Sequence, residues 1–439
     1  MITTEQAKLF NTVGEYDIVV MGAGSGGIGA AVSAARQGMS VALVEQYGFA
    51  GGTGTLCNCP IYFGFGYNGR QITAGICDEV IRKLDAMDAV CFMTDNNPLY
   101  PDMQPIGYKP IKNMVMTDIP TMQVVYNKLL TDAGVDCLFY SYLTDAVVED
   151  RQIAGALIGR IEGPGVIYGK YFIDGTGDAL LIHYAGGETR EYSPEYNMHK
   201  SLFFDMCNVG PYDLDYANNQ YHTLFKNGET PNGCLDFFMH TEKRVPGVTL
   251  IAFGKTSGDA LTSAGMTKMD MDMREQQLKI ADFMRNKMPG FKNAEICGSA
   301  IRVGVRAGRG IVGIETLEAD KVFSDYVCEN PVALITKQAG DHSNNEKFMP
   351  EWSKKMDGLG AVPAGALISK SFDNAFACGR AISAEPMLTR TYRMMNTCMT
   401  TGEASGIMAA MAIKNKALPR NLNYSDLKEE MLKCGFILE

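Results

Sequence analysis

The chain has 439 residues, more than one hydrophobic core usually serves, so we expect two closely connected domains. Apolar residues make up 46% and charged residues 21%, and no unbroken apolar run approaches the ~20 residues that span a bilayer, so we expect no membrane partner. The net charge of -10, without a basic block, argues against nucleic acid as a partner. Twelve scattered cysteines are typical of reduced thiols, and no export signal is visible, so we expect a cytoplasmic location.

The first motif follows a short apolar run. Residues 16–21, YDIVVM, predict a buried strand, and Gly22, Gly24 and Gly27 follow it with the spacing GxGxxG. A helix pattern covers residues 28–37, and residues 39–45 predict a second buried strand that ends in Glu45. This order of strand, glycine turn, helix, strand and acid predicts a dinucleotide site.

Each part of the motif has a physical task. Gly22 permits a tight turn, Gly24 lets backbone N–H groups approach the pyrophosphate, and Gly27 lets the helix pack closely on the strand. Glu45 follows Gly22 at about the 20-residue separation at which an acid meets the ribose hydroxyls. The start of the helix adds partial positive charge for the phosphates.

A second glycine-dense loop, QYGFAGGTGT, occupies residues 46–55. An NAD site has no need for such a loop directly after the ribose acid, whereas the longer FAD molecule must also be held along its ribityl chain. The sequence therefore favours FAD over NAD.

From this loop onward the chain resembles the FAD-dependent oxidoreductase family of the glutathione reductase superfamily. The resemblance covers nearly the whole sequence and is carried by residues 135–148 (VDCLFYSYLTDAVV), 171–178 (YFIDGTGD), 374–384 (NAFACGRAISA) and 391–406 (TYRMMNTCMTTGEASG). It implies an α/β fold with a Rossmann-like FAD-binding domain, of three β/β/α layers with a parallel sheet, built from residues 1–186 and 359–439. The same resemblance implies that residues 187–358 form an inserted mixed α+β cap domain over the isoalloxazine ring.

The family motif at 391–406 also suggests a role for one helix. The resemblance implies a helix that begins near Met399 and directs its first N–H groups at flavin N1 and the C2 carbonyl. A purely structural interpretation makes Thr397, Thr400 or Thr401 the helix cap. The motif and the resemblance together predict these FAD-binding residues: Gly22, Gly24, Ser25, Gly26, Gly27, Glu45, Gln46, Gly51, Gly52, Thr53, Gly54, Thr55, Leu143, Thr176, Gly177, Asp178, Gly379, Arg380, Thr397, Gly402, Glu403 and Ala404.

In the middle of the chain the pattern changes. Residues 201–209, 233–239 and 248–253 predict strands, and residues 270–288 predict a helix that Pro289 and Gly290 end. Residues 300–317 resemble a family segment whose arginines match Arg306 and Arg309, but Ala307 and Gly308 depart from that pattern.

Candidate substrate-binding and catalytic residues are few. Arg306 and Arg393 could bind an anionic substrate with their planar guanidinium forks, or instead make structural ion pairs or flavin phosphate contacts. His240 is the first histidine to consider as an acid or base, since His183, His199, His222 and His342 fit surface or core positions equally well. Tyr192 and Tyr196 are further candidates, and no spacing of residues predicts a metal site.

The sequence thus predicts an enzyme that moves a hydride between flavin N5 and a small organic substrate, which we expect to be anionic if the arginines bind it. The electron partner and the oligomeric state stay open. One alternative is a flavoprotein subunit for electron transfer or redox sensing. Another is a disulfide reductase that uses Cys57 and Cys59, although a disulfide between cysteines separated by one residue would form a strained ring.

Overall fold

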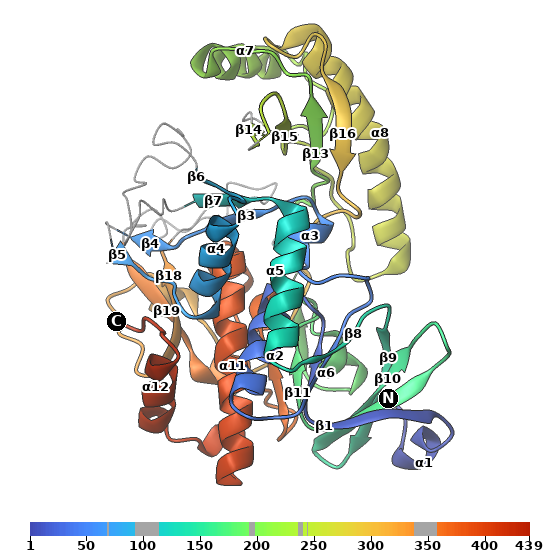
Figure 1. The fold of residues 1–439 in the computed structure, drawn as a ribbon, viewed down its shortest axis with the longest axis vertical. Coiled ribbons are helices and arrows are strands. Elements are labelled where there is room, and N and C mark those ends of the chain that lie inside the picture. Colours follow the sequence, from blue (N-terminus) through green and yellow to red (C-terminus); the bar gives the residue numbers. More distant parts are fainter. Residues whose placement is uncertain (68–69, 93–113, 193–197, 236–239, 244, 338–357) are drawn as a thin grey trace.

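The fold is seen in a computed structural model, which describes residues 1–67, 70–92, 114–192, 198–235, 240–243, 245–337 and 358–439 (Figure 1). A parallel layer at its centre consists of β8 (Asp136–Leu138), β2 (Val41–Val44), β1 (Asn11–Met21), β11 (Gly165–Asp174) and β20 (Ala375–Ala377), in that order. The apolar strands β1 and β2 pair from Ile18 with Val41 to Met21 with Val44. All eight of these residues are buried, as expected for a strand pair covered on both faces.

A second, antiparallel layer branches from the same strand. The strands β9 (Tyr142–Glu149) and β10 (Gln152–Gly159) continue from the first half of β11, while β20 pairs with residues 172–174 of its second half. With the helices, these strands make the predicted three-layer α/β fold with a parallel sheet, and that prediction is confirmed. Residues 135–148 contribute two strands that do not pair with each other, because β8 and β9 lie at opposite ends of the sheet.

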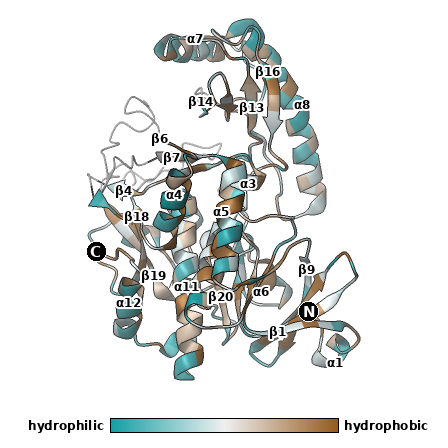
Figure 2. Cartoon of the chain, in the orientation of Figure 1, coloured by the Kyte–Doolittle hydropathy of each residue, from teal (hydrophilic) through white to brown (hydrophobic). Residues whose placement is uncertain are grey.

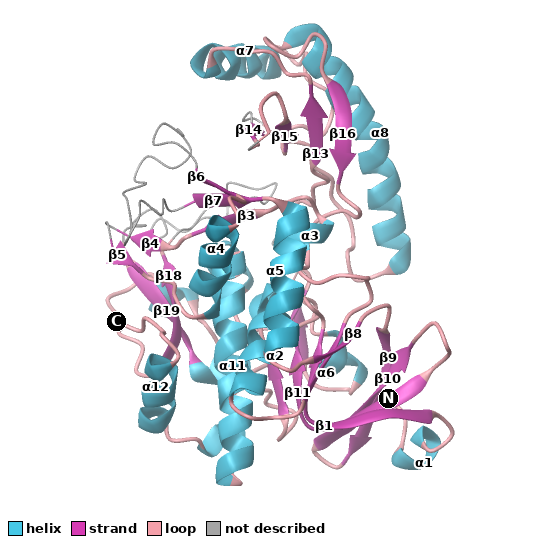
Figure 3. Cartoon of the chain, in the orientation of Figure 1, coloured by secondary structure: helices cyan, strands magenta, loops and turns pink. Residues whose placement is uncertain are grey.

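Two helices on the parallel layer approach each other very closely. They are α2 (Ser25–Arg36) and α11 (Met395–Asn415), around which α4 (Ile76–Ala86) and α5 (Ile119–Asp132) gather (Figure 3). A Cβ atom on Gly29 would lie 2.3 Å from the carbonyl oxygen of Met399, and one on Gly402 would lie 1.9 Å from that of Gly26. Glycine is therefore needed where the two helix backbones meet.

At one end of the molecule, away from the parallel layer, lies a smaller antiparallel sheet (Figure 1). Its strands run in the order β14 (His240–Glu242), β15 (Thr249–Ile251), β13 (Phe204–Cys207) and β16 (Glu295–Ser299), beside α7 (Leu214–Lys226) and α8 (Ser263–Lys287). The strands predicted at 201–209 and 248–253 are present in shortened form. The helix predicted at 270 begins earlier, because the Thr262 side chain caps it by accepting from the Gly265 amide.

The third predicted strand of this region, 233–239, is described only in part. Cys234 forms an isolated bridge with Gly254, and residues 236–239 lie outside the described residues.

The remaining elements fill the edges of these layers. They are α1 (Thr4–Ala7), α3 (Thr53–Leu56), β3 (Ile61–Phe63), β4 (Gly66–Tyr67), β5 (Arg70–Gln71), β6 (Val90–Phe92), β7 (Met114–Thr117), α6 (Leu180–Tyr184), β12 (Thr189–Glu191), β17 (Arg309–Ile311), α9 (Ala319–Val322), β18 (Pro331–Thr336), β19 (Leu359–Pro363), α10 (Thr389–Tyr392), α12 (Tyr424–Lys433) and the short 3-10 helices η3 (Ala364–Leu367), η4 (Gly379–Ala381), η5 (Pro386–Leu388) and η6 (Pro419–Asn421).

The division at residues 186/187 and 358/359 stays a proposal. Strand β18 pairs with β19 across the second of these boundaries, and Val322 and Val332 pack in the same core cluster as Ile28 of α2.

The outward faces of α8 and α12 are hydrophilic (Figure 2). Among the described residues, no helix is long and apolar enough to cross a membrane.

Candidate cofactor and substrate site

The glycine turn between β1 and α2 leaves space at one position. Gly22 has φ +95°, and a Cβ atom there would lie 2.7 Å from the carbonyl oxygen of Gly175, while one on Gly27 would lie 1.8 Å from that of Gly22. A Cβ atom on Gly24 would meet nothing nearer than the Gly175 carbonyl oxygen at 4.0 Å. Two glycines thus close the turn and the third opens it, which fits a pyrophosphate at the start of α2.

The second glycine loop lies against this turn. The Gly51 amide donates to the carbonyl oxygen of Ala23 at 2.8 Å, and a Cβ atom on Gly52 would lie 2.8 Å from the Cα of Gly24. A Cβ atom on Gly54 would lie 2.9 Å from the sulfur of Met395, at the start of α11. The loop therefore connects the turn with α11, along the path that a ribityl chain would take.

Glu45 ties the turn to the loop. Its carboxylate accepts from the amides of Ala23 at 2.8 Å and Tyr47 at 3.0 Å, and burial raises its pKa although these amides oppose the shift. The Glu45 carbonyl oxygen accepts from the Ser141 amide at 2.9 Å, which brings the segment leading to Leu143 beside it. The predicted ribose acid and the predicted adenine neighbour thus lie at one end of the site.

A cavity of about 410 Å³ adjoins this end. It lies between the loop after Glu45 and α8, and it is lined by Tyr47, Met266, Thr267, Asp270, Met271 and Arg302. Its volume is within the ~300–1,000 Å³ range of small-molecule sites. Helix α8 therefore borders the space beside Glu45, the predicted ribose acid.

Among the other predicted cofactor residues of the first two loops, exposure differs. Ser25 and Gly26 are buried at the start of α2, Gln46 and Thr53 are exposed, and Thr55 donates from its hydroxyl to the Ala50 carbonyl oxygen at 3.0 Å.

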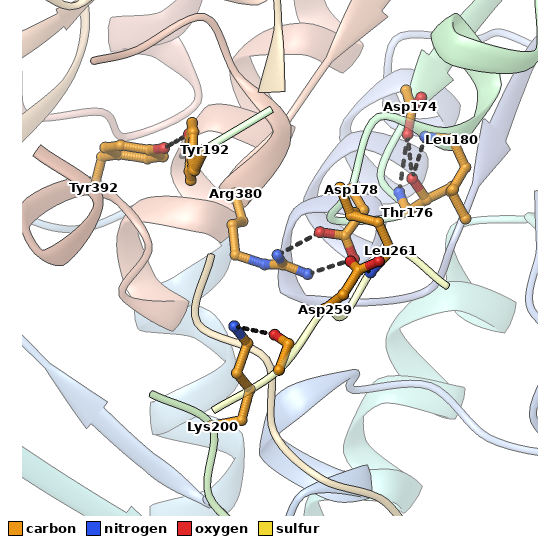
Figure 4. A network of polar contacts seen from close by, with 11 residues as sticks. Asp174, Thr176, Asp178, Leu180, Tyr192, Lys200, Asp259, Leu261, Arg380 and Tyr392 are labelled. Atoms are coloured by element: carbon orange, nitrogen blue, oxygen red, sulfur yellow. Dashed lines mark hydrogen bonds and ion pairs between the residues drawn. The ribbon is translucent and has the colours of Figure 1, made fainter. Parts of the chain in front are cut away.

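The loop after β11 is held by an acid that the sequence analysis missed. The buried carboxylate of Asp174 accepts from the Thr176 hydroxyl at 2.6 Å (Figure 4). It also accepts from the Ile182 amide at 3.1 Å, and burial raises its pKa. The Thr176 hydroxyl in turn accepts from the Leu180 amide at 3.0 Å. An acid at the end of a buried strand was the sequence signal for this role.

Asp178 and Arg380 form a bidentate ion pair, at 2.6 and 2.9 Å, across the entrance to this loop (Figure 4). A Cβ atom on Gly177 would lie 2.9 Å from the Arg380 guanidinium, and one on Gly308 would lie 2.2 Å from the Asp178 carboxylate. The departure from the family pattern at Gly308 therefore has a physical reason, because a larger residue would collide with the pair. Ala307, the other departure, is fully buried beside Tyr192.

Helix α11 begins at Met395, four residues earlier than predicted near Met399. The proposed caps are wrong for Thr400 and Thr401, because their hydroxyls lie within the helix and donate to the carbonyl oxygens of Asn396 at 3.1 Å and Cys398 at 2.9 Å. Thr397 lies in the first turn but makes no cap, since the N-cap Met394 has no side-chain hydrogen bond.

Three predicted cofactor residues lie away from the start of α11. At 1.5 Å per residue, Gly402 is about 10 Å along the helix, where it packs on Gly26. Glu403 accepts from the Ile76 amide of α4 at 2.9 Å, and Ala404 is buried in the helix core. The structure does not bring these three to the helix terminus, whereas it places Gly379 within hydrogen-bond distance of Thr401.

The two predicted substrate arginines lie close enough for their charges to interact. Arg306 donates to the His199 carbonyl oxygen and the Ser201 hydroxyl, both at 2.9 Å, and burial lowers its pKa to about 10. Burial, and next the charge of Arg306, lower the pKa of Arg393 to about 9. Within the described ranges neither guanidinium pairs with a carboxylate, and the buried Nε of Arg393 has no hydrogen-bond partner. Two adjacent cations without a carboxylate partner favour an anion between them.

Arg309, the other matched arginine, differs from these two. It pairs with Glu191 at 2.8 Å and joins β17 to β12, so its role is a structural ion pair.

The neighbouring thiols are poor nucleophiles in this environment. Burial raises the pKa of Cys57 to about 12 and also raises that of Cys59, although Arg306 and Arg393 oppose the second shift. Both thiols are free, and thiolate is the reactive form in disulfide chemistry.

Four predicted acid–base candidates remain: His240, Tyr192, Tyr196 and His342. His240 is the first residue of β14 and pairs with Ile251, but its side chain lies outside the described residues. The buried hydroxyls of Tyr192 and Tyr392 share a hydrogen bond of 2.5 Å. Tyr196 and His342 lie outside the described residues. A buried lysine, Lys200, also lies here, and no sequence motif indicated it.

The glycine turn, the ribose acid and the second glycine loop define a flavin-binding enzyme built on a dinucleotide fold. The profile of one family, described as FAD dependent oxidoreductase, matches residues 17–431. The chain belongs to this family. The prediction that FAD is the cofactor and that the protein is an enzyme is thereby confirmed.

Individual relatives are distant or match only a short stretch. A stretch of 65 residues is 40% identical to aerobic glycerol-3-phosphate dehydrogenase of Staphylococcus epidermidis, and 69 residues are 38% identical to the enzyme of the same name from Staphylococcus saprophyticus. The matches span 15% and 16% of this chain but only 12% of each relative.

Two solved structures share the fold over most of the chain. A geranylgeranyl bacteriochlorophyll reductase-like protein from Thermoplasma acidophilum has a TM-score of 0.52 at 15% identity, covering 97% of this chain and 85% of that one. An aromatic hydroxylase from angucycline biosynthesis has a TM-score of 0.50 at 14% identity, covering 91% and 63%.

Proposed function

We propose that this enzyme transfers a hydride between N5 of FAD and a small anionic organic substrate. The observation that carries the proposal is the pair Arg306 and Arg393, two neighbouring guanidiniums with no carboxylate partner in the described part of the chain. Bound FAD supplies the capacity to accept or donate the hydride. We further propose that the family belongs to the glutathione reductase superfamily.

The chain's own residues would hold the cofactor and orient the substrate. Glu45, the opened turn at Gly24 and the loop at Gly51 and Gly52 would hold the cofactor. Arg306, fixed by His199 and Ser201, would orient the anionic group of the substrate together with Arg393. The short match to glycerol-3-phosphate dehydrogenases, whose named substrate carries a phosphate, agrees with an anionic substrate.

The alternatives have less support. A disulfide reductase needs a thiolate, whereas burial raises the pKa of both Cys57 and Cys59. An electron-transfer subunit or redox sensor would have no need for two neighbouring, half-buried arginines without a carboxylate partner in the described part of the chain.

The test replaces each arginine by lysine, which retains the charge but loses the planar fork. A panel of small carboxylates and phosphate esters, followed through the bleaching of FAD absorbance, would first identify a substrate. We expect Arg306→Lys and Arg393→Lys to lower kcat/KM by about 100-fold, equivalent to ~2.8 kcal/mol, while FAD stays bound.

The matched control is Arg309→Lys, because Arg309 is a buried arginine that already pairs with Glu191. It should leave kcat/KM within a few-fold of the wild type. Unchanged catalysis in both test variants would exclude the arginines as substrate ligands, and loss of FAD would reassign the affected arginine to the cofactor.

A further inference from the structure

A half-buried arginine, Arg302, lines the cavity of about 410 Å³ between the loop after Glu45 and α8. It belongs to the segment that follows β16, far along the chain from the glycine turn. Tyr47 is part of the same lining, and its phenol lies beside the Arg302 guanidinium. A distant segment therefore brings a positive charge to the end of the site where Glu45 lies.

The backbone around Arg302 is held from two sides. The amides of Ile301 and Arg302 donate to the Leu56 carbonyl oxygen, at the end of α3, at 2.8 and 3.4 Å. The Arg274 guanidinium of α8 donates to the carbonyl oxygens of Ala300 and Ile301, at 2.8 and 2.9 Å. The position of Arg302 is thereby tied both to the second glycine loop and to α8.

Helix α3 connects Arg302 with the glycine turn. The helix begins at Thr53, directly after Gly52, and a Cβ atom on Gly52 would lie 2.8 Å from the Cα of Gly24. Gly24 is the position that the turn leaves open. Because α3 has only four residues, it is ~6 Å long. Arg302 therefore lies within reach of a long side chain from the space that the turn leaves for a pyrophosphate.

No carboxylate in the described part of the chain forms an ion pair with Arg302. Asp270 of the cavity lining accepts from a backbone amide at 3.2 Å, and Asp178 pairs with Arg380. Glu45 accepts from two amides, and burial raises its pKa although the charge of Arg302 is among the influences that oppose this shift. A guanidinium stays charged in proteins, so Arg302 faces the cavity as a cation that lacks an anion.

We propose that Arg302 binds the pyrophosphate of FAD from the side of the cavity, while the glycine turn binds it with backbone amides. The inference rests on FAD as the cofactor and not on hydride transfer. A pyrophosphate carries two negative charges, and the planar guanidinium fork matches two of its oxygens. Binding of FAD would then also fix the segment after β16, and with it α8, against the glycine loop.

The first measurement is the affinity of the cofactor-free protein for FAD, followed by the fluorescence change on binding. Arg302→Met removes the charge and keeps a long side chain. We expect it to raise the FAD dissociation constant about 10- to 100-fold, which corresponds to the loss of hydrogen bonds between charged groups. Arg302→Lys keeps the charge but loses the fork, so its affinity should lie between those of Arg302→Met and the wild type.

The matched control is Lys268→Met, which removes a positive charge from α8 itself. Lys268 is exposed and pairs with Asp272, and it is not part of the cavity lining. This variant should bind FAD as the wild type does.

The second measurement identifies the part of FAD that Arg302 contacts. ADP and adenosine compete with FAD for the cofactor-free protein, and their inhibition constants are compared between variants. ADP carries the pyrophosphate, whereas adenosine has only the ribose and the adenine. Arg302→Met should weaken ADP by about the same factor as FAD and should leave adenosine unchanged.

The outcomes separate this inference from the proposed function. Unchanged FAD affinity in Arg302→Met would overturn the inference and would leave a separate anion as the occupant of the cavity. Equal losses for ADP and adenosine would also overturn it, since Arg302 would then support the shape of the site and not the pyrophosphate. If Arg302→Met does not fold, the same comparison with Arg302→Lys decides.

Failure of the wild type to bind FAD would overturn both the cofactor assignment and this inference. Unchanged catalysis in Arg306→Lys and Arg393→Lys would contradict the proposed function alone, because the FAD, ADP and adenosine affinities are measured without turnover.

Discussion

Single carboxylates organise the loops of the cofactor site by accepting backbone amides. Glu45 holds Ala23 and Tyr47, and Asp174 holds Thr176 and Ile182, so each acid fixes two points of the chain at once. Glu45 can still accept from ribose hydroxyls, because a carboxylate has about four lone-pair positions. Its loss should therefore weaken the cofactor site more than it weakens the fold.

We expect Glu45→Ala to weaken FAD binding by ~1.5–3 kcal/mol, the value of a hydrogen bond to a charged group. The measurement is the FAD dissociation constant, from the fluorescence change when FAD is added to the cofactor-free protein. Glu15→Ala, at an exposed position of β1, is the control and should bind as the wild type does. Equal affinity in Glu45→Ala and the wild type would contradict the role given to Glu45.

Local order in the sequence was enough to identify Gly22, Gly24, Gly27 and Glu45 as candidates, because the turn, the helix and the acid are neighbours along the chain. The ion-pair partner of Arg380 and the burial of Lys200 could not be predicted from neighbouring residues in the sequence. Asp178 and Arg380 are 202 residues apart, and only the packing of distant segments brings them together.

At the scale of helices and strands, the main feature is the close contact between helices. Helices α2 and α11 meet through glycines, and α11 also receives the start of α4 at Glu403. The family resemblance assigned Gly402, Glu403 and Ala404 to the cofactor, whereas the structure packs Gly402 on Gly26 and bonds Glu403 to the Ile76 amide. The resemblance also placed the start of α11 near Met399, four residues later than the structure has it, and the three threonines offered as caps do not cap the helix.

The buried acid Glu403 gives the fold a pH dependence. Burial raises its pKa from 4.5 to about 8, so between these values the folded chain retains a proton that the unfolded chain releases. Stability contributed by this proton is complete below pH 4.5 and declines as pH rises toward 8, by at most ~1.4 kcal/mol per pH unit.

We therefore expect Glu403→Gln to lose less stability than the wild type between pH 5.5 and 7.5. Urea unfolding at several pH values measures this slope. Glu429→Gln, at a fully exposed glutamate of α12, should keep the wild-type slope. Parallel slopes for Glu403→Gln and the wild type would show that Glu403 is ionised in the folded protein.

At the scale of the whole molecule, segments from both ends of the chain form the candidate cofactor site. Strand β20 and helix α11 join β1 and α2, while the smaller antiparallel sheet and α8 lie at the far end with their own core. The resemblance to the FAD-dependent oxidoreductase family predicted this α/β plan. The opposite positions of β8 and β9 could not be predicted, because strands that are close in sequence commonly pair and here each finds a distant partner instead.

The central claim is that the glycine turn, Glu45 and the second loop hold one FAD molecule per chain. Purified protein is denatured, and the released cofactor is separated by chromatography against FAD, FMN and NAD standards and compared with the amount of protein. We expect FAD in an amount approaching that of the chain, because Glu45 needs an adenosine ribose to contact and the second loop needs a ribityl chain. FMN or NAD as the released species would contradict it.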